Sequence, residues 1–170
     1  MKKGLALVSP GFDSPVAAYL MSKNSEIMLL HFNAWPFVSR KCLERVKSLK
    51  RALEVFTGKK FLLYSVSNAF VQKKLYDELN EFRCVVCKRS MYKLANIVAK
   101  KVDAEFLVTG ENVGQVASQT LANLKVLDEA SELPVIRPLI GYDKQEIISL
   151  SKKVGTFRVS SLPEVSCKIV

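Results

Sequence analysis

Short apolar runs alternate with longer amphipathic segments along the chain, and this alternation limits the possible folds more than any other feature. Five runs have the length and composition of buried strands: residues 5–8, 27–32, 61–66, 106–108 and 135–137. Apolar residues at helical spacing occupy the segments between them. Such alternation favours a parallel sheet with helices on both faces, because parallel strands are joined through crossover helices. The sequence therefore predicts an α/β fold of three layers, α/β/α, around a parallel sheet of about five strands.

The expected helices have recognisable start signals. Pro15 suits a first helical turn, with Ser14 as its N-cap, and Asp143 is the expected cap of the last helix. Between them, helices are expected at 38–56, from 67 or 68 to about 80, from 83 to about 102, and at roughly 116–130. The buried stripe of the helix that begins at 83 is expected to be Met91, Leu94, Val98 and Val102. No repeat or linker interrupts the pattern, so residues 1–170 are expected to form one domain.

The composition is that of a globular protein without a disulfide scaffold. Hydrophobic residues make up 49% and charged residues 25% of the chain. No apolar run reaches the length of a membrane span, and the N-terminus lacks the apolar region of a signal peptide. We therefore expect a cytoplasmic protein that makes no membrane contact. In that compartment the four cysteines are expected to be thiols or ligands.

Positive charge is concentrated in one part of the chain. The formal net charge is +10, and residues 39–101 contain 16 of the 26 Lys and Arg but only 5 of the 16 acidic residues. Part of this excess can be a solvated helix face. One-sided basicity with a pI near 9.5 also favours a polyanionic partner such as RNA.

The first strand runs into a hydroxyl-rich loop, residues 9–14, and then into a helix N-terminus. This order suits a phosphate group, because unpaired N–H groups and the helix dipole both favour an anion there. The loop lacks the Gly-Lys-Ser/Thr ending of a Walker A loop and the three glycines of a dinucleotide fingerprint. An ordinary strand–helix turn is the alternative. Loops 31–37 and 109–112 also follow strands, so all three are expected at the carboxyl edge of the sheet, where ligands bind.

The loop resembles the SGGxDS pyrophosphate loop of the ATP pyrophosphatase (PP-loop) superfamily. Five of its six positions fit, and Pro10 stands in place of a glycine, which removes one N–H. Four longer stretches resemble the pyrophosphatase domain of the tRNA 4-thiouridine synthetase and thiamine-biosynthesis sulfurtransferase family. They are SPGFDSPVAAYLM (9–21), CVVCKRSM (84–91), LVTGENVGQVASQTLANL (107–124) and RPLIGYDKQEII (137–148). The resemblance implies an adenine nucleotide alpha-hydrolase-like fold, that of a PP-loop ATPase.

The resemblance also implies an activity, that of an ATP-dependent tRNA sulfurtransferase. Members of the family adenylate O4 of a tRNA uridine with release of pyrophosphate; sulfur then attacks C4, AMP leaves, and 4-thiouridine is formed. Asp13 is implied as a catalytic residue, and Mg²⁺ is expected to neutralise the triphosphate. The ATP contacts that the resemblance implies are Leu7, Val8, Ser9, Gly11, Asp13, Ser14, His31, Phe32, Lys88, Gly110 and Gln119.

Several of these residues have simpler interpretations. His31 can be a core histidine with satisfied hydrogen bonds, and Lys88 can be a solvent-exposed charge. Gln119 belongs to a polar stripe with Gln115 and Asn123, at positions i, i+4 and i+8, which can equally be a solvated helix face.

The cysteines allow three interpretations. Cys167 lies near the position at which family members place a cysteine that resolves a persulfide intermediate. Cys84 and Cys87, a CxxC pair, can also join Cys167 as three ligands of an iron–sulfur cluster, as in archaeal-type relatives. A zinc site or buried thiols are the third interpretation. All three cysteines are thus candidate catalytic residues and candidate metal ligands.

The loop begins at residue 9, so no N-terminal THUMP RNA-binding region is expected before it. The resemblance implies two partners, tRNA and a sulfur donor, and the donor is either sulfide or a persulfide protein. The tRNA would be contacted by the basic residues 39–101, by a separate THUMP-type protein or with the help of a dimer partner. Two other functions stay open. One is an adenylating enzyme of thiamine or sulfur-carrier metabolism that acts on a substrate other than tRNA, and the other is a nucleotide-binding module without turnover.

Overall fold

The computed structural model describes residues 1–77, 82–113 and 119–163. Five parallel strands form one sheet, in the order β3-β2-β1-β4-β5. The strands are β1 (Lys3–Leu7), β2 (Glu26–Asn33), β3 (Leu63–Ser67), β4 (Phe106–Val108) and β5 (Val135–Ile136). The predicted five-stranded parallel sheet is therefore confirmed.

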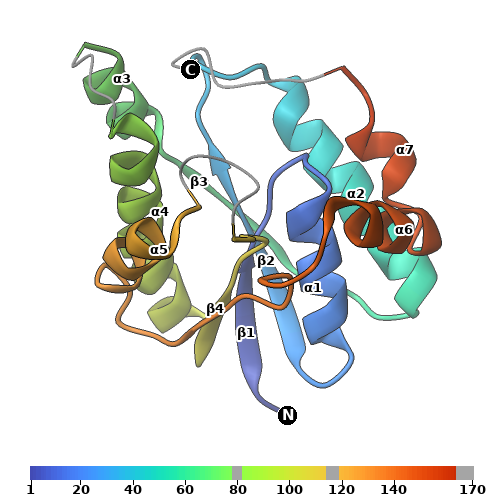
Figure 1. Ribbon diagram of the computed structural model, residues 1–170. Coiled ribbons are helices and arrows are strands. Elements are labelled where there is room, and N and C mark those ends of the chain that lie inside the picture. Colours follow the sequence, from blue (N-terminus) through green and yellow to red (C-terminus); the bar gives the residue numbers. More distant parts are fainter. Residues whose placement is uncertain (78–81, 114–118, 164–170) are drawn as a thin grey trace.

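Helices cover both faces of this sheet, as Figure 1 shows. One face carries α3 (Ala69–Asp77), α4 (Arg83–Lys101) and α5 (Leu121–Asp128). The other carries α1 (Asp13–Ser22), α2 (Lys41–Thr57) and α6 (Lys144–Lys153). The short α7 (Phe157–Ser160) packs against α2 and α6. The predicted three-layer α/β/α architecture is thus confirmed.

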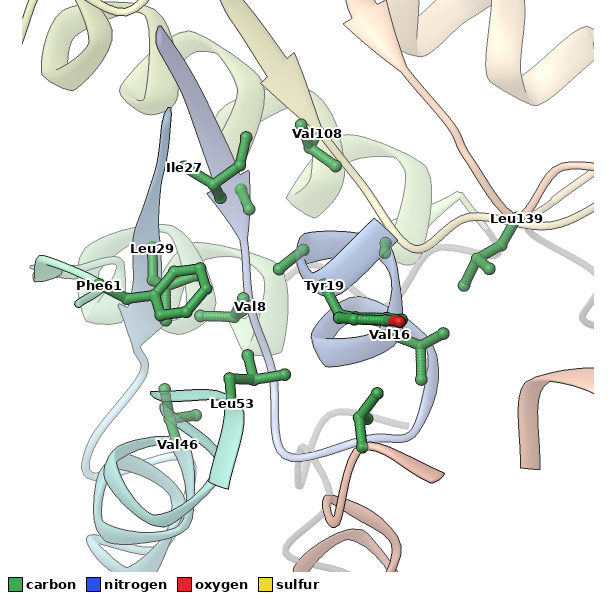
Figure 2. Close-up of a cluster of buried hydrophobic side chains, with 14 of the residues drawn as sticks. Val8, Val16, Tyr19, Ile27, Leu29, Val46, Leu53, Phe61, Val108 and Leu139 are labelled. Atoms are coloured by element: carbon green, nitrogen blue, oxygen red, sulfur yellow. The ribbon is translucent and has the colours of Figure 1, made fainter. Parts of the chain in front are cut away.

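Alternate residues of each strand fill two separate cores, because successive side chains point to opposite faces. Ala6, Leu29 and Val108 belong to the cluster of buried side chains beside α1 and α2, which Figure 2 shows. Leu5 and Leu30 lie on the opposite face, in a cluster with alanines of α4. Burial on both faces explains why the strands are nearly continuous apolar runs.

Two details of the helices differ from the sequence prediction. α1 begins at Asp13, and Ser14 is not its N-cap, because the hydroxyl of Ser14 bonds the loop before the helix instead. On α4 the predicted stripe of Met91, Leu94, Val98 and Val102 is only partly buried. The buried residues are Tyr92, Ala95, Asn96 and Ala99. Small alanines let α4 approach the sheet, and the polar side chains of Tyr92 and Asn96 are hydrogen-bonded where they are buried.

Two helix boundaries follow the sequence signals. Gly58 ends α2 with a left-handed φ of 68°, which glycine adopts without strain. Asp143 caps α6 in a capping box with Glu146, in which each side chain accepts the other residue's backbone N–H. Within the described ranges no helix is both long and apolar enough to cross a bilayer.

Candidate functional site

The strand order reverses at the central strand β1. The chain passes from β1 outward to β2 and β3, and then returns to the other side of β1 for β4 and β5. Ligands of parallel sheets bind beside the carboxyl ends of the strands at such a point. The residues after β1 and after β4 meet here. A Cβ on Gly110 would lie 2.6 Å from the Ser14 backbone nitrogen, so this close approach requires a glycine.

Hydroxyl groups hold the loop after β1. The Ser9 N–H donates to Ser14 Oγ at 2.9 Å, and the two hydroxyl oxygens lie 3.3 Å apart. The Gly11 N–H points back to Ser9 Oγ at 3.4 Å. Because α1 begins at Asp13, its N-terminal N–H groups and positive dipole end lie at the end of the loop. This geometry supports the predicted phosphate loop.

The segment from α6 to α7 contacts the tip of the same loop. Lys144 Nζ lies 3.2 Å from Asp13 Oδ1 and 5.5 Å from the centre of the Phe12 ring. The Ser160 hydroxyl donates to the Gly11 carbonyl at 3.1 Å. Three successive loop residues therefore have partners more than 130 positions away in the sequence.

Two cavities adjoin the loop, and Ser9 and Pro10 line both of them. The larger cavity, about 730 Å³, lies between the loop, α2 and the segment from α6 to residue 163. Its polar lining includes Arg45, Lys144 and Ser160. The smaller cavity, about 290 Å³, lies over the ends of β1 and β2.

The smaller cavity brings together predicted site residues from separate strands. Leu7 and Val8 come from β1 and its end, and His31 and Phe32 from β2. The other residues that line it are Ala34, Val38, Cys42, Asn68, Gln72 and Met91. Burial raises the pKa of the Cys42 thiol, with partial opposition from Arg45, so Cys42 is a neutral apolar part of this wall.

Two residues that line this cavity contain buried polar atoms that lack hydrogen-bond partners. Among the residues that the structure describes, this holds for Nε2 of His31 and for both Oδ1 and Nδ2 of Asn68. The two residues are 3% and 2% exposed. Buried polar groups normally find partners, since leaving one unpaired costs about 1–3 kcal/mol. Three such atoms, in two residues of one cavity wall, make this cavity the candidate ligand site.

The hydrogen bonds of His31 define its protonation state. Nδ1 lies 3.0 Å from the Val8 carbonyl oxygen. Because a carbonyl only accepts, Nδ1 carries the proton and Nε2 keeps a lone pair that has no partner. Burial lowers the pKa of His31, with partial opposition from the Val8 bond, so the ring is neutral at pH 7. The core-histidine interpretation therefore fits one ring nitrogen and not the other.

A second buried polar cluster surrounds Glu111, directly after β4. Its Oε2 accepts from the Tyr92 hydroxyl at 2.6 Å, from Arg137 Nε at 2.9 Å and from the Thr109 hydroxyl at 3.2 Å. Its Oε1 accepts from Lys88 Nζ at 3.3 Å. Four donors from α4 and from the ends of β4 and β5 thus converge on one carboxylate.

The cluster keeps Glu111 ionised. Burial alone would raise the pKa of Glu111, but Lys88, Tyr92 and Arg137 together outweigh burial and hold that pKa below its usual value. Burial and the neighbouring carboxylate both raise the pKa of Tyr92, so its hydroxyl stays protonated and donates. Asp128 accepts two bonds from the Arg137 guanidinium, at 2.6 and 3.3 Å.

The cysteines of the CxxC motif lie at the start of α4. Cys84 is exposed, and Cys87 Sγ is half-buried and accepts from Gln72 Nε2 at 2.9 Å. Cys167 lies outside the described residues, as does Gln115. The grouping of Cys84, Cys87 and Cys167, as thiols or as cluster ligands, therefore stays a prediction.

Five predicted contacts do not line either cavity: Asp13, Ser14, Lys88, Gly110 and Gln119. Among the described residues, Lys88 is engaged by Glu111, and Gln119 Oε1 accepts the Asn112 N–H at 3.4 Å. Sequence reasoning did not single out Asn68, Glu111, Arg137 or Lys144 as site residues. Glu111 lies in the family-like stretch 107–124, and Arg137 and Lys144 lie in the stretch 137–148, so the resemblance could have pointed to them. Asn68 lies in none of the four stretches.

One family model matches the whole chain. It is described as ThiI, thiamine biosynthesis protein, and it covers residues 1–170. The chain belongs to the ThiI family. A probable tRNA sulfurtransferase of Alkaliphilus metalliredigens is 42% identical over 97% of this chain and 42% of its own length. The chain spans less than half the length of this and other curated tRNA sulfurtransferases that it matches.

Solved structures agree with the family and with the fold. A 4-thiouridine synthetase, crystallised as an RNA complex with bound ATP, superposes with a TM-score of 0.91 and 36% identity, over 98% of this chain and 44% of that chain. The U34-tRNA thiolase NcsA from Methanococcus maripaludis, solved with its [4Fe-4S] cluster, has a TM-score of 0.66 and 18% identity, over 99% of this chain and 61% of that chain. The second likeness shows the fold alone. The first confirms the PP-loop ATPase fold that the sequence predicts.

Proposed function

We propose that this chain binds ATP and adenylates a tRNA uridine, as the pyrophosphate-releasing part of a ThiI-family tRNA sulfurtransferase that makes 4-thiouridine. The observation that carries the proposal is the smaller cavity, in which His31 Nε2 and the Asn68 amide are buried without partners beside a hydroxyl-rich loop. The names of the relatives and the ATP-bound 4-thiouridine synthetase support it.

The smaller cavity suits the adenosine half of ATP. An Asn side chain can donate to and accept from adenine at the same time, because its amide matches the donor and acceptor edge of the base. The lone pair of His31 Nε2 accepts from an amine or hydroxyl of the ligand. Phe32 and Met91 add apolar walls, which suits a flat aromatic base.

The phosphates then lie against loop 9–14. The N–H groups at the start of α1 and the hydroxyls of Ser9 and Ser14 are donors for the pyrophosphate, and Lys144 adds a positive charge. Mg²⁺ neutralises the triphosphate when it is bound, and the Asp13 carboxylate at this loop is the type of oxygen ligand that Mg²⁺ prefers.

In the reaction, uridine O4 forms a bond to the α-phosphorus of ATP. The bond between the α-phosphorus and the bridging oxygen breaks, pyrophosphate leaves with the electron pair, and the uracil N3 proton is lost. A uracil oxygen leaves readily only after it has become such an ester. The loop donors stabilise the charge that develops on the departing pyrophosphate.

The sulfur-transfer half of the reaction is proposed for the cysteines, in either of two forms. Cys84, Cys87 and Cys167 would hold an iron–sulfur cluster that binds sulfide. Alternatively, the outer sulfur of a donor persulfide would bond C4 as AMP leaves, and the Cys167 thiolate would then form a disulfide with the donor's inner sulfur, leaving the outer sulfur on C4. Anaerobic purification followed by iron and sulfide assays separates the two. A colourless, iron-free protein that still thiolates tRNA would rule out the cluster.

Pyrophosphate release tests the adenylation step directly. The chain is incubated with ATP and Mg²⁺, with and without unmodified tRNA. Release that requires tRNA is the expected result. Release without tRNA would instead support adenylation of a small molecule or sulfur carrier, for which the family description as a thiamine biosynthesis protein is a specific reason. No release under either condition would contradict both.

Asp13→Ala is the matched test of the loop. We expect its tRNA-dependent pyrophosphate release to fall by about 100-fold or more, because it removes the carboxylate proposed to hold the Mg²⁺ that neutralises the triphosphate. Asp103→Asn is the control, since Asp103 is exposed on the turn before β4. Unchanged turnover in Asp13→Ala would disprove the assignment of the loop.

A further inference from the structure

The N-terminal end of α2 and the loop before it carry an exposed aromatic side chain among positive charges. Trp35, in the loop after β2, is 47% exposed. The guanidinium of Arg40 lies over its ring, with Cζ 4.5 Å from the ring centre. We propose that this surface, formed by Trp35, Arg40, Lys41 and Arg45, contacts the RNA substrate, with one unpaired base stacked beside Trp35 and backbone phosphates on the cations.

The charges of this surface are available to a polyanion. Among the described residues, neither Arg40 nor Lys41 forms an ion pair with a carboxylate. The nearby acidic residue of α2, Glu44, pairs with Lys47 at 2.8 Å. Lys41 and Arg45 are four residues apart and so lie on one side of the helix. The surface therefore presents cations to the solvent without a compensating negative charge.

The surface adjoins the places where chemistry is proposed. Ala34, directly before Trp35, lines the smaller cavity, and so does Cys42 of α2. Arg45 lines the larger cavity, and its Nη1 donates to the Pro163 carbonyl at 2.7 Å. An RNA strand held at Trp35 and Arg40 can therefore place a neighbouring nucleotide beside loop 9–14.

An aromatic ring with an adjacent arginine suits RNA better than duplex DNA or an acidic protein. Single-stranded or splayed RNA bases stack on aromatic rings and on guanidinium planes, while lysines and arginines neutralise phosphates. An acidic protein would use the cations but would leave the indole without a stacking partner. The RNA assignment rests on the proposed function, and it adds which residues of this chain hold the RNA.

The test uses the natural probe in this surface, because Trp35 is the single tryptophan of the chain. Unmodified tRNA is titrated into the protein at several salt concentrations, and Trp35 fluorescence and filter binding are followed. The proposal predicts quenching of Trp35 as tRNA binds. Trp35→Ala should weaken tRNA binding by about fivefold or more, and Trp35→Phe by much less, because stacking on an aromatic ring is retained. Arg40→Gln and Lys41→Gln should each reduce the salt slope of binding by about 1.

Lys23→Gln is the matched control. Lys23 also lies over an aromatic ring, 5.1 Å from the centre of Tyr19, but at the other end of α1 from the loop. It should leave tRNA affinity within about twofold of wild type. The inference is overturned if tRNA binds without changing Trp35 emission, or if Trp35→Ala binds as tightly as wild type. If tRNA-dependent pyrophosphate release is intact, either result disproves the RNA contact at this surface and leaves the proposed function standing. A wild-type chain that neither binds tRNA nor releases pyrophosphate would contradict the proposed function as well.

Discussion

The buried polar groups on the two sides of β1 differ in whether they are paired. In the smaller cavity, over the ends of β1 and β2, His31 Nε2 and the Asn68 amide lack partners. Beyond β4, Glu111 is equally buried, yet four donors converge on it. Similarly buried polar groups therefore have different effects on stability, depending on whether they are hydrogen-bonded. Hydrogen-bonded groups stabilise the folded chain, whereas unpaired groups reduce its stability until a ligand bonds to them.

The largest effect is expected from removing the saturated carboxylate. Glu111→Ala should lower the free energy of unfolding by about 3–5 kcal/mol, because it leaves Lys88 and Arg137 without their buried counter-charge. Urea denaturation followed by circular dichroism measures this. Glu105→Ala is the control, since its ion pair with Lys2 is exposed and should contribute about 0–1 kcal/mol. Equal losses in the two variants would remove the contrast between the two regions.

The cavity should respond in the opposite way. Asn68→Ala should leave the free energy of unfolding at or above the wild-type value, because it removes an amide that is buried without partners. Its ATP affinity should nevertheless fall about tenfold, the equivalent of one or two lost hydrogen bonds. Calorimetry with ATP measures the affinity, and Asn24→Ala, an exposed asparagine after α1, is the control. If Asn68→Ala were clearly destabilised but bound ATP normally, Asn68 would be a residue that stabilises the fold and not one that binds ATP.

The smallest effect concerns the protonation of His31, the single histidine of the chain. Its pKa lies below 6.5 because burial disfavours the charged ring. As pH falls, the His31 imidazole is protonated in the unfolded chain before it is protonated in the folded chain. The contribution of neutral His31 to the free energy of unfolding is therefore fully present above pH 6.5 and is lost as pH falls through the lowered pKa. ATP that donates to Nε2 favours the neutral ring and should lower the pKa further. NMR titration of the imidazole with and without ATP checks this, and a pKa that rises on ATP binding would contradict it.

The sequence was informative where local physics decides the structure. The apolar runs identified all five strands, and the expected cap Asp143 begins α6 with a capping box, as its chemistry requires. The loops after β1 and β2 were expected at the carboxyl edge of the sheet because each follows a predicted strand, whereas the roles of Leu7, Val8, His31 and Phe32 came from the family resemblance. These features depend on a few neighbouring residues, so a single sequence is enough to detect them.

Which buried polar side chains are hydrogen-bonded could not be predicted, because most of their partners lie far away in the sequence. The donors of Glu111 come from positions 88, 92, 109 and 137, and the partner of Asp13 is Lys144. Asn96 was not assigned to the buried side of α4, since its burial depends on bonds to the Ala130 carbonyl and the Glu132 N–H. Asn68 stands out only because its buried amide lacks hydrogen-bond partners, and no local sequence pattern reveals this.

A crystal structure of the chain with a non-hydrolysable ATP analogue tests the central claim most directly. The account predicts the adenosine in the smaller cavity, with ligand polar atoms within about 3.2 Å of His31 Nε2 and of the Asn68 amide, and the phosphates against residues 9–14. An adenosine bound elsewhere, with His31 Nε2 and the Asn68 amide still unpaired or bonded only to water, would contradict it.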